Sequence, residues 1–186
     1  IATTSSPLPP LPLRNCSPPA QELSAHRFWR IGTSASLGNR WDICSIDFLN
    51  STDGTGHSLV NRSHGAPVAF AGQHGGGKPV DVIGADPLLC NLSNSSTWAM
   101  RWGASPMPGW IGWDFAAGQA CLPYCQPVLV RSIRLRQYDT EYCAKTLAVQ
   151  YSDDGTCWHD SWFVDASKQC PFDATHNPAA GITRSP

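Results

Sequence analysis

Aromatic and cationic side chains gather between residues 98 and 110. Arg101 and Trp102 precede a short proline-containing loop, and Trp110 follows it. An indole ring can stack on the apolar face of a sugar, and an arginine can bond the sugar's hydroxyl groups. These three residues, together with His74 of a glycine-rich segment, are our candidates for a ligand site. The alternative is that the tryptophans only close a loop over the core.

The glycine-rich segment 72–79 matches two catalytic patterns in part. It fits the phosphate-binding pattern G-x-x-x-x-G-K, but Pro79 stands where a Ser or Thr would bind Mg²⁺. His74 and the three glycines after it also echo the oxyanion strip of esterases, yet the chain contains no G-x-S-x-G nucleophile pattern. The sequence shows no nucleophile with a base and no catalytic carboxylate pair, so we expect a protein that is not an enzyme.

Two groups of aspartates could hold a structural Ca²⁺. Asp47 and Asp53 lie around the turn 50–54, and Asp81 and Asp86 form a second group. Calcium takes roughly six to eight oxygen ligands, to which two or three carboxylates bring the charge. The alternative is that these aspartates are solvated turn residues.

Composition excludes several classes of protein. The chain has 186 residues, a net charge of -1 and 15% charged residues, which argues against a basic nucleic-acid-binding surface. No apolar run approaches the roughly 18 residues of a membrane span. Eight Trp and 41% hydrophobic residues can form a core, and 16 Gly with 16 Pro favour many short elements joined by turns.

Cysteine and asparagine usage points to an oxidising, secretory environment. Only Cys121 and Cys125 have the close spacing of zinc ligands, and the chain has no second pair of this kind to complete a zinc site. We therefore expect disulfides, and the sequence does not determine which cysteines pair. The eight cysteines are Cys16, Cys44, Cys90, Cys121, Cys125, Cys143, Cys157 and Cys170.

Five N-x-S/T sequons occur among only seven Asn residues, more than the one or so that chance gives, and such sites mark exposed loops of secreted proteins. They are Asn15, Asn50, Asn61, Asn91 and Asn94. We therefore expect an extracellular glycoprotein, in the form of a mature product or a fragment.

Three regions follow one another along the chain. Residues 1–23 form a proline-rich arm, for which we expect an extended polyproline-II conformation. Residues 24–170 form one antiparallel β-sandwich with long loops, and residues 171–186 a low-complexity tail. Strands are expected at 27–31, 41–48, 110–115, 128–137, 147–151 and 158–164.

Within these strands, most tryptophans are expected to pack in the core: Trp29, Trp113, Trp158 and Trp162. The turn Ser152–Gly155 predicts a β-hairpin, because Asp-Gly tolerates the positive φ of a tight turn.

The segment 147–158, with its Ser-Asp-Asp-Gly turn and following Trp, resembles the discoidin-like (coagulation factor 5/8 type C) family. Thr97-Trp98, the strand 110–115 and the strand 128–135 resemble further pieces of that family, in the same order. The resemblance implies a galactose-binding-like jelly roll. The sequence departs from the family in the Asp-Gly pair that usually precedes Thr-x-Trp, and no late closing strand is evident after residue 164.

The sequence leaves two functions open. The first is a non-enzymatic adhesion module that recognises carbohydrate or extracellular matrix through loops at one end of the sandwich. The second is a structural subunit of an extracellular fibre, appendage or cell wall, in which the proline-rich arm of one copy docks on the next copy.

Reduction of the disulfides should lower the melting temperature by more than about 15 °C, because each disulfide stabilises the fold by roughly 2–4 kcal/mol. Calorimetry with and without a reductant measures this difference. A smaller drop would show that the β core is stable without disulfides.

Overall fold

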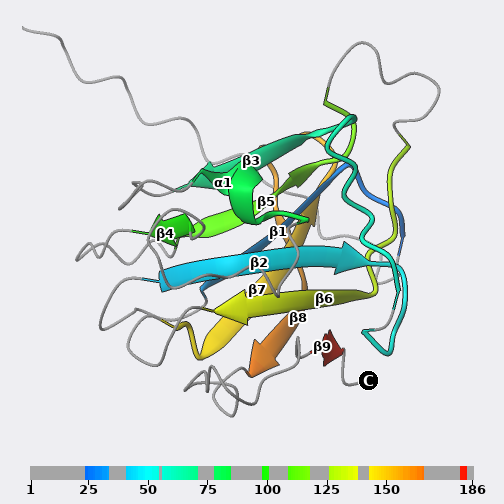
Figure 1. Ribbon diagram of the computed structural model, residues 1–186. Coiled ribbons are helices and arrows are strands. Elements are labelled where there is room, and N and C mark those ends of the chain that lie inside the picture. The colour runs from blue at the N-terminus through cyan, green and yellow to red at the C-terminus, as the bar shows by residue number, and fades with distance from the viewer. Residues whose placement is uncertain are drawn as a thin grey trace, which may run out of the picture.

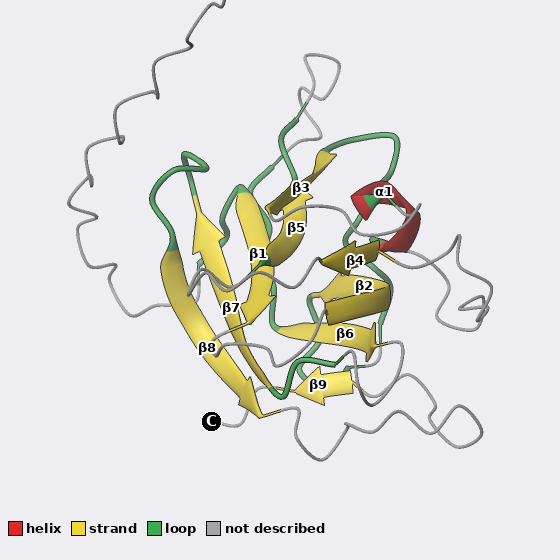
Figure 2. Cartoon of the chain, turned by 90° about the vertical axis from the view of Figure 1, so that its left-hand side faces the viewer, coloured by secondary structure: helices red, strands yellow, loops and turns green. Residues whose placement is uncertain are grey.

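The computed structural model describes residues 24–33, 41–54, 56–70, 78–84, 98–100, 109–117, 126–137, 143–165 and 181–183. Two antiparallel sheets pack face to face in this part of the chain (Figures 1 and 2). Their strands are β1 (Phe28–Thr33), β2 (Trp41–Leu49), β3 (Ala66–Phe70), β4 (Trp98–Met100), β5 (Trp110–Asp114), β6 (Ser132–Gln137), β7 (Thr146–Ser152), β8 (His159–Asp165) and β9 (Gly181–Thr183).

The larger sheet has five strands in the order β3-β5-β1-β7-β8, and the smaller has four in the order β4-β2-β6-β9. Every strand pair in both sheets is antiparallel. The only helix among the described residues is the single turn α1 (Pro79–Val82). The prediction of an all-β, antiparallel fold is therefore confirmed.

Strand β1 lies at the centre of the larger sheet and divides its residues between two faces. Trp29 and Ile31 are buried in the core that the two sheets share. Successive side chains of a strand point to opposite faces, so Phe28, Arg30 and Gly32 stand on the outer face of the sheet. The outer face can therefore carry a site without disturbing the core.

Strand β2 is buried along its whole length, on both faces. One face meets the core. The other face is buried as well. Beyond its short pairing with β4, the edge of β2 pairs through backbone bridges from Ile46 to Ile83 and from Leu49 to Ser58. This double burial explains why the sequence of β2 alternates poorly between apolar and polar residues.

Three short strands lie in segments where the sequence predicted none. Strand β4 pairs with the first residues of β2. Strand β3 falls inside 50–78, a stretch rich in polar residues and glycine for which we expected a long loop, and it pairs with β5. Strand β9 falls inside the expected tail 171–186 and pairs with β6. The proline-rich arm lies outside the described residues.

Each cysteine in the described part of the chain, Cys44, Cys143 and Cys157, is disulfide-bonded. The pairing stays a prediction, because the other five cysteines lie outside the described residues: Cys16, Cys90, Cys121, Cys125 and Cys170. As for membranes, no helix among the described residues has the length and apolar character needed to cross a bilayer.

Replacing Gly112 of β5 with alanine should destabilise the fold strongly. A Cβ at this position would overlap the carbonyl oxygen of Trp29 and lie 2.6 Å from Cα of Arg30, so the strands would have to separate. We expect a loss of at least about 3 kcal/mol in the free energy of unfolding, within the range of severe steric substitutions.

Gly32→Ala is the matched control, because its Cβ would meet its nearest neighbours at 3.2 Å and need only small shifts. Urea unfolding of both variants measures the difference. Equal losses would contradict the close approach of β1 and β5 at Gly112.

Candidate functional site

A cation lies against two indole rings on the outer face of the larger sheet. The Cζ atom of Arg30 lies 3.8 Å from the ring centroid of Trp158 and 4.6 Å from that of Trp110. The two rings are 5.6 Å apart and tilted by 41°. These distances are those of cation–π contacts, in which the ring faces attract the guanidinium group.

The position of Trp158 differs from the core packing that the sequence predicted. Trp162 does pack in the core, and strict alternation would place Trp158 on the same side. The register between β7 and β8 shifts, however, since Val149 pairs with Trp162 and Gln150 with Asp160. The extra residue in β8 reverses the alternation, so Trp158 lies outside with Arg30.

Two polar side chains continue from Arg30 across the sheet. Its Nε donates to Oε1 of Gln150 at 2.7 Å, and Nε2 of Gln150 donates to Oδ1 of Asp160, also at 2.7 Å. Burial lowers the pKa of Arg30 to about 10, and the charge of Asp160 only partly opposes this effect. The guanidinium remains charged at neutral pH, but it makes no direct hydrogen bond to a carboxylate among the described residues.

A second arginine on the same face is paired with a carboxylate. Nε and Nη2 of Arg27 donate to Oδ1 and Oδ2 of Asp114, each at 2.9 Å, and the Arg27 guanidinium lies over the ring of Phe28. The hydrogen bond to Asp114 raises the pKa of Arg27. The face therefore holds one neutralised guanidinium and one without a direct carboxylate partner.

Small residues separate the aromatic groups beside Arg30. Across the strands, Trp110 pairs with Gly32, Gly32 with Ala148, and Ala148 with Phe163. Phe163 is 63% exposed and is the one large hydrophobic residue classed as exposed among the described residues. Both small residues are buried, so the row reaches solvent through the exposed Phe163 at one end and the partly exposed Trp110 at the other.

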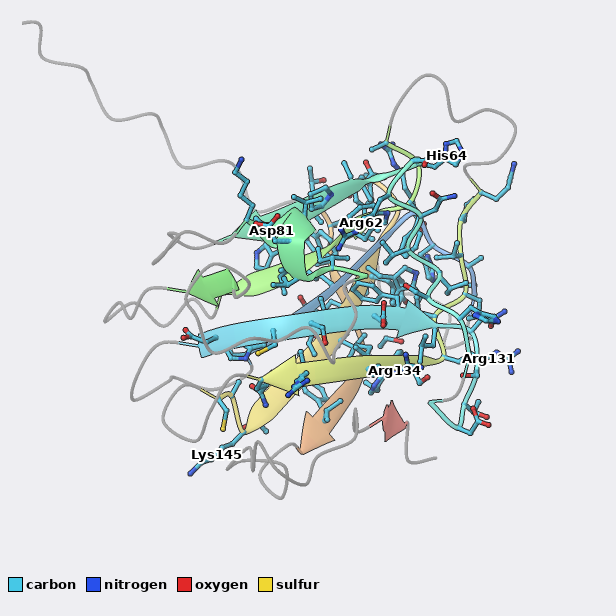
Figure 3. The ribbon with its side chains drawn as sticks, viewed as in Figure 1. Arg62, His64, Asp81, Arg131, Arg134 and Lys145 are labelled. Atoms are coloured by element: carbon cyan, nitrogen blue, oxygen red, sulfur yellow. The ribbon has the colours of Figure 1, made fainter. Side chains whose placement is uncertain are left out.

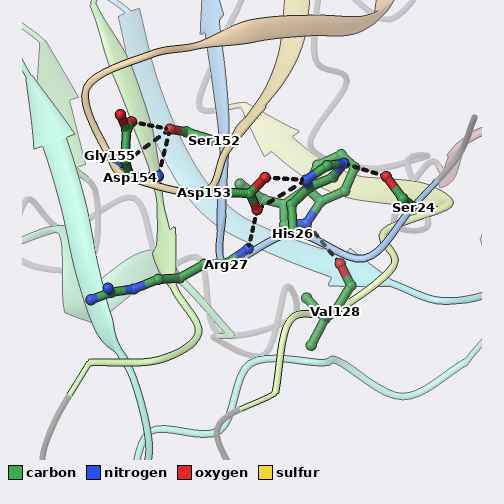
Figure 4. A network of polar contacts seen from close by, with 9 residues as sticks. Ser24, His26, Arg27, Val128, Ser152, Asp153, Asp154 and Gly155 are labelled. Carbon is green, nitrogen blue, oxygen red and sulfur yellow. Dashed lines mark hydrogen bonds and ion pairs between the residues drawn. The ribbon is translucent and has the colours of Figure 1, made fainter. Parts of the chain in front are cut away.

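The hairpin that carries Trp158 has the turn that the sequence predicted. Gly155 has a φ of 73°. Oδ1 of Asp154 accepts from the N–H groups of Thr156 and Cys157, at 2.8 and 2.7 Å, and these bonds hold the pKa of Asp154 well below its usual range. Ser152 Oγ accepts from Gly155 N–H at 2.9 Å, which closes the turn (Figure 4).

A Ser–His–Asp series of contacts, which sequence reasoning missed, joins the start of the domain to this hairpin (Figure 4). Ser24 Oγ lies 2.8 Å from His26 Nε2, and His26 Nδ1 lies 3.1 Å from Asp153 Oδ1. An ionised carboxylate only accepts hydrogen bonds, so Nδ1 carries a proton and a neutral ring accepts at Nε2 from Ser24. Only the fold brings these residues together, since 127 positions separate His26 from Asp153.

The surroundings of this series favour a role in anchoring the chain. His26 is buried and stacked on Tyr151 at 3.8 Å, and its backbone pairs with Val128. Ser24 is exposed, and the Asp153 side chain is 70% exposed, so water competes at both ends. The contacts fasten residues 24–26 to the sandwich.

An arginine occupies the place that the sequence analysis gave to a calcium ion at Asp47. Nη1 of Arg134 lies 3.6 Å from Oδ2 of Asp47, and its Nη2 donates to the carbonyl oxygens of Gly54 and Gly56, at 3.1 and 3.2 Å. Figure 3 shows Arg134 on β6. Burial raises the pKa of Asp47, against the hydrogen bond of Ser58 and the charge of Arg134.

A resident Ca²⁺ does not fit these donors, because Arg134 already supplies the positive charge that gathers the carbonyl groups. In the second aspartate group, Asp81 accepts from the N–H of Lys78 at 2.7 Å and caps α1. Asp86 lies outside the described residues, so calcium at this second group stays a prediction. In the part of the chain that the structure describes, no three His, Cys, Asp or Glu side chains gather as metal ligands would.

Of the remaining predicted site residues, some lie in the described part of the chain and others lie outside it. Trp110 stands on the outer sheet face, whereas Arg101, Trp102 and His74 lie outside the described residues. Among the sequons, Asn50 and Asn61 are exposed. The other three, Asn15, Asn91 and Asn94, fall outside the described residues.

No protein-family model, no curated protein and no solved structure matches this chain. The resemblance to discoidin-like domains therefore remains a sequence-based prediction.

Added calcium should leave the melting temperature within about 1 °C of its value in EDTA, because Arg134 holds the loop that a calcium ion would hold. Arg134→Met should lower the melting temperature by several degrees, about 1–2 kcal/mol, through the loss of its bonds to Gly54 and Gly56. A rise of several degrees with calcium in the wild-type protein would contradict this assignment.

Proposed function

We propose that the protein is an extracellular, N-glycosylated binding module without catalytic activity, which recognises carbohydrate through the outer face of its larger sheet. The observation that carries the proposal is the cluster of Arg30, Trp110 and Trp158 beside the exposed Phe163. This site replaces the loop end of the sandwich as our first candidate, although Trp110 belongs to both.

The face offers the two kinds of contact that sugars need. Aromatic rings give apolar platforms for the C–H faces of a pyranose, and convergent polar groups fix its orientation. Here the polar groups are the Arg30 guanidinium and the side chains of Gln150 and Asp160, which lie on neighbouring strands.

Two observations support the extracellular assignment. Asn50 and Asn61 are exposed at their sequons, as an acceptor of a glycan must be. The cysteines of the described region are disulfide-bonded, a state that persists in oxidising compartments.

We also propose that the sandwich is a discoidin-like jelly roll with the proline-rich arm at its start. The β7–β8 hairpin with its Ser-Asp-Asp-Gly turn and the five-stranded and four-stranded antiparallel sheets support this proposal.

A second candidate function is a self-assembling structural subunit. The exposed Phe163 lies on β8, an edge strand, next to small residues, and such a surface also suits a polyproline segment of another copy. This reading predicts filaments that disappear when residues 1–15 are removed, with no need for a glycan.

Phe163→Ala and Trp158→Ala should each weaken carbohydrate binding by roughly tenfold, because each removes one stacking platform worth about 1–2 kcal/mol. A glycan array followed by calorimetric titration of the best ligand measures the effect. Lys145→Ala, at an exposed position before β7, is the matched control and should bind like the wild type.

If both aromatic variants bind carbohydrate like the wild type, the binding site does not lie on this sheet face. Absence of any glycan ligand, together with filaments that depend on residues 1–15, would replace the proposal with the structural one.

A further inference from the structure

The guanidinium of Arg30 has donors to spare. An arginine carries five N–H donors. The Nε–H of Arg30 bonds Gln150, and the described residues provide no hydrogen-bond acceptor for its two terminal NH₂ groups. Those groups project from a half-buried side chain that two indole rings flank.

Arg27, on the same sheet face, is an arginine whose guanidinium is paired with a carboxylate, and it provides a comparison for Arg30. Its two hydrogen bonds to Asp114 are parallel and equal in length, the bidentate arrangement in which arginine binds a carboxylate. Arg30 has the same chemistry without such a partner. Asp160, the carboxylate whose charge acts on Arg30, accepts a hydrogen bond from Gln150 instead.

Charge and burial act together at Arg30. A half-buried cation loses part of its hydration and gains strongly from an anion that approaches it. The lowered pKa of Arg30 has burial as its first cause, which agrees with this reading. Asp160 is exposed and weakens the attraction for an anion without blocking the guanidinium.

We infer that Arg30 makes this face selective for acidic saccharides, whose carboxylate or sulfate group pairs with the terminal NH₂ groups while the sugar rings lie on the aromatic residues. The inference rests on the proposed carbohydrate site and names its ligand class. A uronic acid or a sulfated sugar presents an anionic group next to an apolar ring face, the same adjacency that Arg30 has with Trp110 and Trp158.

Titration calorimetry with three oligosaccharides of equal length tests the inference: a galacturonide, a sulfated galactan and a neutral galactan. The wild-type protein should bind at least one acidic ligand about tenfold more tightly than the neutral one, and salt should weaken the acidic ligand only. The two acidic ligands show whether carboxylate or sulfate is preferred.

Arg30→Gln should reduce the preference for the acidic ligand to about twofold or less, while neutral binding persists. Asp160→Asn should raise affinity for the acidic ligand roughly two- to threefold, because it removes a nearby negative charge. Lys145→Gln removes one positive charge elsewhere and should change neither ligand, which separates a local contact from the effect of net charge.

Equal binding of acidic and neutral ligands by the wild-type protein would overturn the inference and leave the carbohydrate site standing. Absence of binding to every saccharide would remove both. Should Arg30→Gln fail to fold, the exposed Asp160→Asn variant decides: unchanged or weakened binding of the acidic ligand contradicts the inference.

Discussion

The register of β1 between β5 and β7 is the constraint on which the other features depend. A slip of one residue would send Arg30 into the core and Trp29 to the surface, since strand side chains alternate between faces. Gly112 fixes this register, because its lack of a side chain lets β5 approach the backbone of Arg30. The core and the candidate site are therefore two faces of one strand pairing.

The pairing of β1 with β5 and β7 places the Arg30 guanidinium where burial destabilises its charged form. Burial takes water away from the Arg30 guanidinium, and contact with Trp110 and Trp158 returns about 0.5–2 kcal/mol per ring. The neutral amide of Gln150 adds one hydrogen bond and no charge. Two other arginines are paired directly with carboxylates, Arg27 with Asp114 and Arg134 with Asp47. Arg30 differs from both, and this difference is what makes the outer face a site.

The sequence predicted the elements whose pattern is local. Alternation identified β6 and β7, a short aromatic run identified β1, and flanking turn residues identified β5. The Asp-Gly pair identified the hairpin before β8, where side-chain bonds from Asp154 and Ser152 close the turn. It missed β3, β4 and β9, which are short and pair only with distant strands. No pattern in the sequence indicates the register shift between β7 and β8, so the outward position of Trp158 could not be predicted. Asp47 looked like a calcium ligand because its partner, Arg134, lies 87 positions along the chain.

Nuclear magnetic resonance of the tryptophan indole N–H groups, with an acidic oligosaccharide added, tests the central claim most directly. The account predicts that the Trp158 and Trp110 signals shift with the ligand, while those of the buried Trp29 and Trp113 stay in place. Shifts confined to Trp102, with Trp158 unchanged, would place binding at the loop end of the sandwich and contradict the account.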